Sequence, residues 1–191
     1  VAGDKFTVFI GADNVKIGRA AGQWARTALD GKGHIVELKG LMTSTPGQDR
    51  HKGFAEGLRA DKSLAVVFEA EMKWLEAEAR KEMESALASH AQIDLVYAHN
   101  DPGAHGAYLA AKAAGRHKSI KFVDIDALPH EGVQYVKEGI LDATFAYPTG
   151  GAEAIEVALK ILGGATVPKK IVLGTRLYTK DNLAKGGVEL K

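Results

Sequence analysis

Short apolar runs alternate along the chain with longer stretches in which apolar residues recur every three or four positions. The short runs are rich in β-branched and aromatic residues, which is typical of buried strands. They predict strands at residues 5–10, 34–38, 64–68, 94–98, 120–125, 142–146 and 170–174.

The longer stretches predict helices at residues 16–29, 50–60, 75–89, 102–114, 131–138 and 152–162. Leu75, Ala79 and Met83, for example, fall on one helical face. Strands that alternate with helices favour an α/β fold: a doubly wound, mainly parallel, Rossmann-like sheet with helices on both faces. A Pro and two Gly follow Tyr147, so we place the boundary between two segments there, at residues 1–147 and 148–191.

The composition is that of an ordinary globular protein, with 46% hydrophobic and 26% charged residues among 191. Lys and Arg number 25 and Asp and Glu 24, so the net charge is +1, and no run of basic residues offers the face that nucleic acid requires. Cysteine is absent, which excludes disulfides, thiol nucleophiles and Cys-ligated zinc. No apolar run is long enough to insert into a membrane, and we expect no signal peptide in this sequence.

Polar residues and a few aromatic ones follow the predicted strands. Ligands of an open parallel sheet bind beyond the carboxyl ends of its strands, so these residues are candidates for a site. They are Asp13, Asn14, Thr43, Ser44, Gln48, Asp49, Arg50, Glu69, Glu71, Lys73, Trp74, His99, Asn100, Asp101, Asp126, His130, Tyr147 and Thr149. Carboxylate, amide and guanidinium groups beside aromatic rings suit a neutral, polyhydroxylated ligand.

Some of these residues also have a purely structural explanation. Asp13 and Asp101 stand where helix N-caps belong. Arg50 could be a solvated helix residue, and Trp74 could pack at the start of a helix. Asp126 is harder to explain in this way, because a carboxylate at the end of an apolar strand needs a partner.

Sequence signatures of enzymes are missing: there is no GxSxG, GxxxxGK[ST] or HExxH pattern, and no GxGxxG after the first strand. His99 and His105 would not share a helix face, so we expect no metal site and no cofactor. Asp124 and Asp126 lie two positions apart on one strand. An acid–base group made of these two residues and His130 is therefore the enzymatic alternative to a binding protein.

Four segments resemble the ribose/galactose-type periplasmic sugar-binding proteins, which have the type I solute-binding fold. They are GADNVKIGRAAGQWA, RHKGF, LVYAHNDPGAHGAYLAAKAAG and FVDIDALPHEGVQYVKEGILDATFAYPTGGAEAI, in this order. That family has two similar α/β lobes joined by three crossings. The resemblance implies that residues 1–147 form the second, C-terminal lobe, that residues 148–191 form a crossover helix and a terminal strand, and that the first lobe is absent.

The resemblance also implies a site in the cleft between lobes. Its ligand-binding residues would be Asp13, Arg50, Trp74, Asn100, Asp126 and Tyr147. Arg50 would donate to sugar hydroxyls, Asp126 would accept from a pair of them, and Trp74 would stack on the sugar ring. We expect Arg50 and Asp126 to lie on loops at the cleft, with neither fully buried.

The implied function is binding of a small carbohydrate in the periplasm, without catalysis. The segment ATFAYPTGGAEAIEVALKILGG is similar to sugar-sensing ectodomains of bacterial membrane histidine kinases. The expected partners besides the sugar are therefore the membrane permease of an ABC transporter or a sensor kinase, and closure of the lobes about their hinge would carry the signal. The effector-binding domain of a sugar-responsive transcription repressor shares this fold and is an alternative.

Overall fold

The computed structural model describes residues 4–60 and 63–190. At its centre is a seven-stranded sheet in the order β3-β2-β4-β5-β6-β8-β9. Five strands are parallel: β2 (Lys32–Lys39), β3 (Ser63–Glu71), β4 (Leu95–Ala98), β5 (Lys121–Asp126) and β6 (Ala143–Ala146). The remaining two, β8 (Arg176–Thr179) and β9 (Val188–Glu189), are antiparallel to their neighbours and complete one edge.

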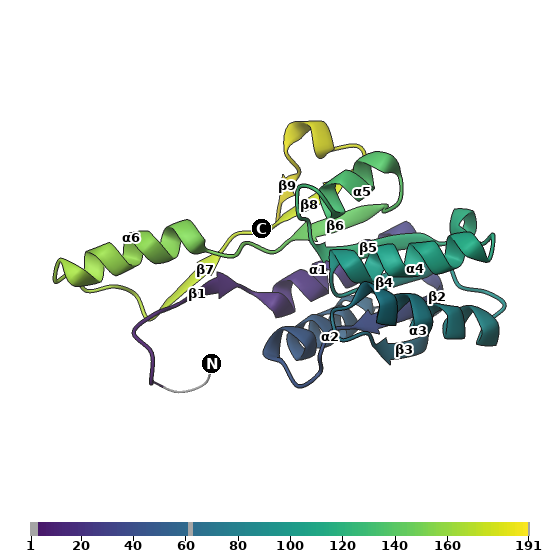
Figure 1. Cartoon of the computed structure of the whole chain (residues 1–191), viewed down its shortest axis with the longest axis horizontal. Helices are drawn as coiled ribbons and strands as arrows, with labels where there is room; N and C mark the ends of the chain where they lie inside the picture. Colours follow the sequence, from purple (N-terminus) through teal and green to yellow (C-terminus); the bar gives the residue numbers. More distant parts are fainter. Residues whose placement is uncertain (1–3, 61–62, 191) are drawn as a thin grey trace.

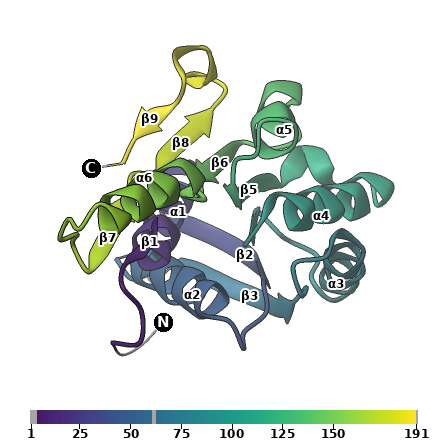
Figure 2. The same cartoon turned by 60° about the vertical axis from the view of Figure 1, so that its left-hand side comes forward.

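Helices cover both faces of this sheet (Figures 1 and 2). The first layer consists of α1 (Asn14–Ala28) and α2 (Thr45–Leu58). The second consists of α3 (Glu76–Ser89), α4 (Asp101–Ala113) and α5 (Gly132–Glu138) on the opposite face. The predicted doubly wound α/β fold is confirmed.

The strands of the sheet divide their apolar residues between the two helix layers. Ile35 and Leu95 pack with α1 and α2, whereas the next residues, Val36 and Val96, pack with α3 and α4. All four side chains are fully buried. Because both faces are covered, β4 is a continuous apolar run (LVYA), and the buried run of β2 (IVEL) is interrupted only by Glu37.

Glycines allow α1 and α2 to pack backbone against backbone. A Cβ atom on Gly18 would overlap the carbonyl oxygen of Arg50, and one on Gly53 would overlap that of Val15. The close approach places Arg50, in the middle of α2, beside the start of α1, where its side chain reaches Asn14.

A smaller unit, called the arm below, projects from the sheet (Figure 1). The arm consists of the parallel pair β1 (Phe9–Ala12) and β7 (Lys170–Leu173) together with α6 (Gly151–Leu162). The chain enters the arm after β6 and returns to the main sheet with β8. On α6, Leu159 and Leu162 are 64% and 84% exposed, so the arm carries apolar side chains that nothing in the described chain covers.

The ends of the chain differ from the prediction. The first strand begins at Phe9, not at residue 5, and pairs with the last predicted strand in the arm, so neither belongs to the main sheet. The antiparallel strands β8 and β9 and two short 3₁₀ helices, η1 (His117–Ser119) and η2 (Leu183–Lys185), were not predicted. β9 and the 3₁₀ helices have only two or three residues, too few to show a period, and β8 (RLYT) lacks the apolar run by which the other short strands were predicted.

One helix boundary was also wrong. The helix predicted from residue 50 begins at Thr45, because the side chain of Ser44 accepts a hydrogen bond from the N–H of Gly47 and Pro46 stands in the first turn. Both are standard signals of a helix start. The correction matters for the site, since Arg50 lies inside this helix and not on a loop.

Candidate functional site

A cavity of about 340 Å³ opens at the carboxyl edge of the parallel strands. Its lining comes from α2 and from the segments that follow β3, β4, β5 and β6. The lining residues are Pro46, Arg50, Trp74, Asn100, Asp126, Leu128, Tyr147 and Thr149. Five of the six site residues predicted from the sequence are therefore brought together, and they stand where ligands of such sheets bind.

Arg50 is the central group of this cavity, and its guanidinium is held from three directions. Nε donates to Oδ1 of Asn14 at 3.0 Å, one terminal nitrogen donates to the carbonyl oxygen of His99, and the other donates to Oδ1 of Asp126 at 3.2 Å. Three fixed acceptors leave this side chain little rotational freedom, so its position is set before any ligand arrives.

Two aromatic rings lie against the same guanidinium. Its central carbon lies 5.5 Å from the ring centroid of Trp74 and 4.8 Å from that of Tyr147, within the range of cation–π attraction. As a result Arg50 is only 3% exposed. The expectation that Arg50 would not be fully buried was wrong, because these rings and its three acceptors enclose it.

Asp126 ends β5 in a strained backbone conformation, with φ at 134°, and the next residue, Ala127, has φ at 53°. The carboxylate of Asp101 holds this bend by accepting the N–H groups of Ala127, Leu128 and Gly132 at 3.1, 2.8 and 3.0 Å. Asp101 therefore does more than occupy the start of α4: it fixes the direction in which Asp126 enters the cavity.

Burial and neighbouring charges shift the pKa of Asp126 in opposite directions. Burial raises the pKa of its carboxyl to about 6, while the neighbouring Arg50 acts in the opposite direction and Asp101 and Glu131 add to the rise. At neutral pH the group is ionised and is paired with Arg50. An ionised carboxylate beside a guanidinium places hydrogen-bond acceptors next to donors. Adjacent hydroxyls of one ligand can then bind to both groups.

Asn100, and not Asp101, caps α4, and it also supports the backbone at Trp74. Its Oδ1 caps α4 by accepting the N–H of Gly103 at 3.1 Å, and its Nδ2 donates to the carbonyl oxygen of Trp74 at 3.1 Å. Trp74 has φ at 67°, so this hydrogen bond supports a backbone conformation that a non-glycine residue rarely adopts. The Trp74 ring lies against Gly40, where any Cβ would overlap it.

Asp13 is not part of this cavity. It is exposed, and its Oδ1 accepts the N–H of Lys16 at 2.9 Å at the start of α1. It lines a different hollow, with Lys16, Arg19 and Leu190. The structure thus supports the capping explanation for Asp13.

The acid–base group considered as an enzymatic alternative is not assembled at the cavity. Asp124 is completely buried beside Asp101 and Thr144, and burial together with the charge of Asp101 raises the pKa of its carboxyl well above the usual range. A carboxyl with no exposed surface cannot reach a ligand, so Asp124 and Asp126 do not act as a pair although they are two positions apart.

Sequence reasoning missed two supports of the site. The carbonyl oxygen of His99 accepts from Arg50, and nothing in a side-chain pattern indicates a main-chain contact of this kind. Leu128 supplies an apolar part of the wall from the loop after β5. In the sequence, only the position of Leu128 two residues after Asp126 could have indicated that it lines the cavity.

A doubly wound α/β lobe with a preorganised guanidinium, a carboxylate and two aromatic rings at the carboxyl edge of its sheet defines the ligand-binding lobe of a solute-binding protein. The sequence model of the family described as "Periplasmic binding protein domain" matches residues 3–166. This chain belongs to that family.

Known proteins of similar sequence and structure agree with this assignment. The ribose import binding protein of Salmonella typhimurium is 30% identical over 174 residues, which is 90% of this chain and 58% of that protein. The fructose-binding periplasmic domain of a hybrid two-component system is 44% identical, with a TM-score of 0.95, over 97% of this chain and 63% of its own. A Mycobacterium smegmatis protein in complex with β-D-fucofuranose is 31% identical, with a TM-score of 0.90, over 97% and 64%.

This chain spans less than two thirds of the length of each of these relatives. The family is one of periplasmic substrate-binding and sensor proteins, and its curated relatives include ribose import binding proteins. Within residues 4–60 and 63–190, the structure contains no helix with the length and apolar character needed to cross a bilayer.

Proposed function

We propose that this chain forms one wall of a cleft that binds a single monosaccharide, with no chemical conversion of the sugar. The observation that carries the proposal is the cavity in which Arg50 is fixed between Asp126 and two aromatic rings. The part of the cleft that this wall provides is a cavity of about 340 Å³, within the range of roughly 300–1,000 Å³ found for small-molecule pockets.

Each lining group has a role in this proposal. Asp126 accepts from a pair of sugar hydroxyls, Asn100 exchanges hydrogen bonds with another, and the free edge of Arg50 donates to ring or hydroxyl oxygens. Trp74 and Tyr147 cover C–H surfaces of the ring. Asp13, which lies outside the cavity, has no role in contacting the sugar.

The opposite wall of the cleft comes from a first lobe outside this sequence, and the arm belongs to that lobe. Two observations support this part of the proposal. The relatives are longer by more than a third, and α6 presents Ile155, Leu159 and Leu162, one helical turn apart, with exposures of 65%, 64% and 84%. Packing of a further α/β unit on the arm would bury this stripe and leave β1, β7 and the segment after β6 as the crossings between lobes.

The signal from the bound sugar goes to a sensor kinase in preference to a permease. This choice rests on similarity, since the fructose-binding domain of the two-component system is 44% identical to this chain, while the import protein is 30% identical. Closure of the lobes on the sugar supplies the conformational change in either case, and it takes place in the periplasm.

Isothermal titration calorimetry with D-fructose, D-ribose and D-galactose tests the proposed site. In the two-lobed protein, Asp126→Asn removes a charged acceptor, and we expect it to weaken binding by about 1.5–3 kcal/mol, or roughly 10- to 160-fold. Asp181→Asn is the matched control, because Asp181 follows β8 at the opposite edge of the sheet. Unchanged affinity in Asp126→Asn, or an equal loss in the control, would show that the cavity is not the sugar site.

A further inference from the structure

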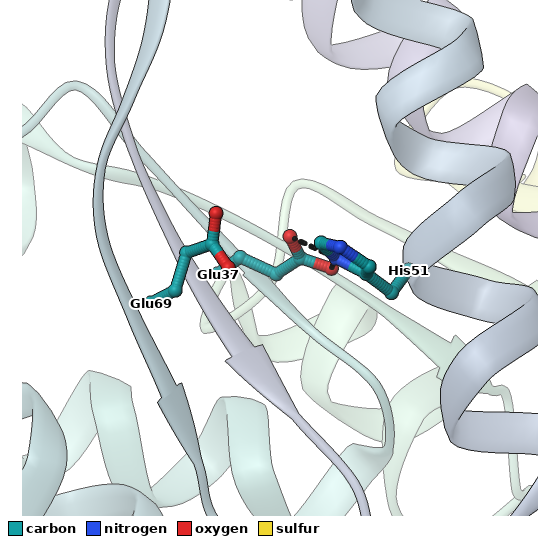
Figure 3. Close-up of side chains that lie close together, drawn as sticks. All are labelled: Glu37, His51 and Glu69. Carbon is teal, nitrogen blue, oxygen red and sulfur yellow. Dashed lines mark hydrogen bonds and ion pairs between the residues drawn. The ribbon is translucent and has the colours of Figure 1, made fainter. Parts of the chain in front are cut away.

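A second group of polar side chains lies under α2, on the face of the sheet covered by α1 and α2. Glu37 on β2 and Glu69 on β3 come from neighbouring strands, and His51 extends toward them from α2 (Figure 3). One ligand atom from each of the three residues lies within 4.8 Å of the others. None of the three lines the cavity around Arg50, so this cluster is separate from the proposed sugar site.

The dimensions of the cluster match one metal ion. A tetrahedral metal ion bound at about 2.0–2.2 Å by nitrogen and oxygen ligands holds those ligands roughly 3.3–3.6 Å apart. Nδ1 of His51 is already 3.0 and 3.1 Å from the two carboxylate oxygens of Glu37. His51 and Glu69 are partly exposed, so their side chains can rotate toward the buried Glu37 to place three donors around one ion. We propose that Glu37, His51 and Glu69 form a site for a divalent transition-metal ion of the zinc type.

The buried member of the cluster is held in place by a second histidine. Nδ1 of His99 accepts the N–H of Gly40 at 3.1 Å, which assigns the ring proton to Nε2, and Nε2 then donates to Oε1 of Glu37 at 3.0 Å. Both His99 and Glu37 are buried. A carboxylate ligand oriented by a fixed hydrogen-bond donor is the usual support found behind metal ligands.

The donor types and the access route select the class of ion. One imidazole and two carboxylates suit borderline cations such as Zn²⁺ or Co²⁺, whereas Mg²⁺ prefers oxygen ligands only. The side chains of His51 and Glu69 are 34% and 41% exposed, so an ion can enter from solvent and keep water at its open positions. Lys39 now pairs with Glu69 at 2.6 Å, and the metal replaces this surface ion pair, which is worth little.

Calorimetric titration of the metal-free protein with zinc chloride alone tests the site. We expect one saturable site per chain, at least tenfold weaker in His51→Gln and in Glu69→Gln, and no binding of magnesium chloride at the same concentrations. His105→Gln is the matched control, because His105 forms a 2.8 Å pair with Glu76 that has no third ligand beside it among residues 4–60 and 63–190. The zinc affinity of the His105→Gln variant should stay within twofold of that of the wild type.

Three results would overturn the proposal: no saturable zinc binding by the wild type, wild-type affinity in either variant, or loss of binding in the control. If a variant fails to fold, zinc X-ray absorption of the wild-type protein decides the question. Scattering from one imidazole is expected, and its absence would contradict the role of His51. Sugar binding is not needed for any of these outcomes, so they are independent of the proposed function.

Discussion

Large apolar side chains are buried in the main sheet unit but exposed on the helix of the arm. In the sheet unit, large apolar side chains such as Phe54 on α2 are completely buried between helices and strands. In the arm, Ile155, Leu159 and Leu162 form a stripe on α6 that is mostly exposed. The sheet unit therefore has a complete core of its own. The arm carries an amphipathic helix whose apolar stripe is not covered by any other part of the described chain.

The largest effect should come from deleting a core ring in the sheet unit. Phe54 stacks on Tyr97 with a centroid distance of 4.0 Å, and its removal leaves a cavity between α2 and β4. We expect Phe54→Ala to lower the free energy of unfolding by about 3–5 kcal/mol, measured by urea denaturation. A loss below about 1 kcal/mol would contradict the view that this unit has a packed core.

A second prediction concerns the cavity at the edge of the sheet, where sugar affinity should depend on pH through Asp126. The pKa of Asp126 is raised to about 6, so its carboxylate gains a proton as the pH falls through that value. If only the ionised form accepts sugar hydroxyls, affinity in the two-lobed protein should be constant above pH 7 and about tenfold lower at pH 5. Calorimetry between pH 5 and pH 8 measures this change.

The same shift has a stability consequence of defined sign. A carboxyl whose pKa is higher in the folded than in the unfolded state contributes stability that is fully present below about pH 4 and is lost as the pH rises through 6. Asp126→Asn should remove both this pH dependence of stability and the pH dependence of sugar affinity. A variant that keeps the full pH dependence of binding would assign it to another group.

The smallest effect should come from a deletion in the arm. Leu159 is 64% exposed, so Leu159→Ala in this chain should change the free energy of unfolding by less than about 0.5 kcal/mol. The contrast with Phe54→Ala measures how differently the two regions are packed. A loss above 2 kcal/mol in this chain would mean that α6 is already covered.

Much of the fold could be predicted from periodicity. The helix pattern at Leu75, Ala79 and Met83 and the apolar runs of β4 and β5 are long or regular enough to identify their elements. Position in the sheet could not be predicted, because β1 resembles the other strands in composition although it pairs only with β7 in the arm. That pairing depends on where the chain goes after β6.

The site could be predicted as far as it depends on strand ends. Arg50, Asn100 and Asp126 were expected at one edge because the carboxyl ends of parallel strands meet there. The burial of Arg50 could not be predicted, since it depends on Trp74 and Tyr147 lying against its guanidinium. The cluster of Glu37, His51 and Glu69 was not predicted either, because it joins two strands and a helix with no motif in the sequence.

The central claim is that the cavity around Arg50 is one wall of a two-walled sugar site. The most direct test compares calorimetric titrations of this 191-residue chain and of the same chain preceded by a first lobe, each with D-fructose, D-ribose and D-galactose. We expect saturable binding of at least one monosaccharide by the two-lobed protein and an affinity at least a hundredfold weaker in this chain alone. Equal affinity in the two proteins, or no binding of any monosaccharide by the two-lobed protein, would contradict it.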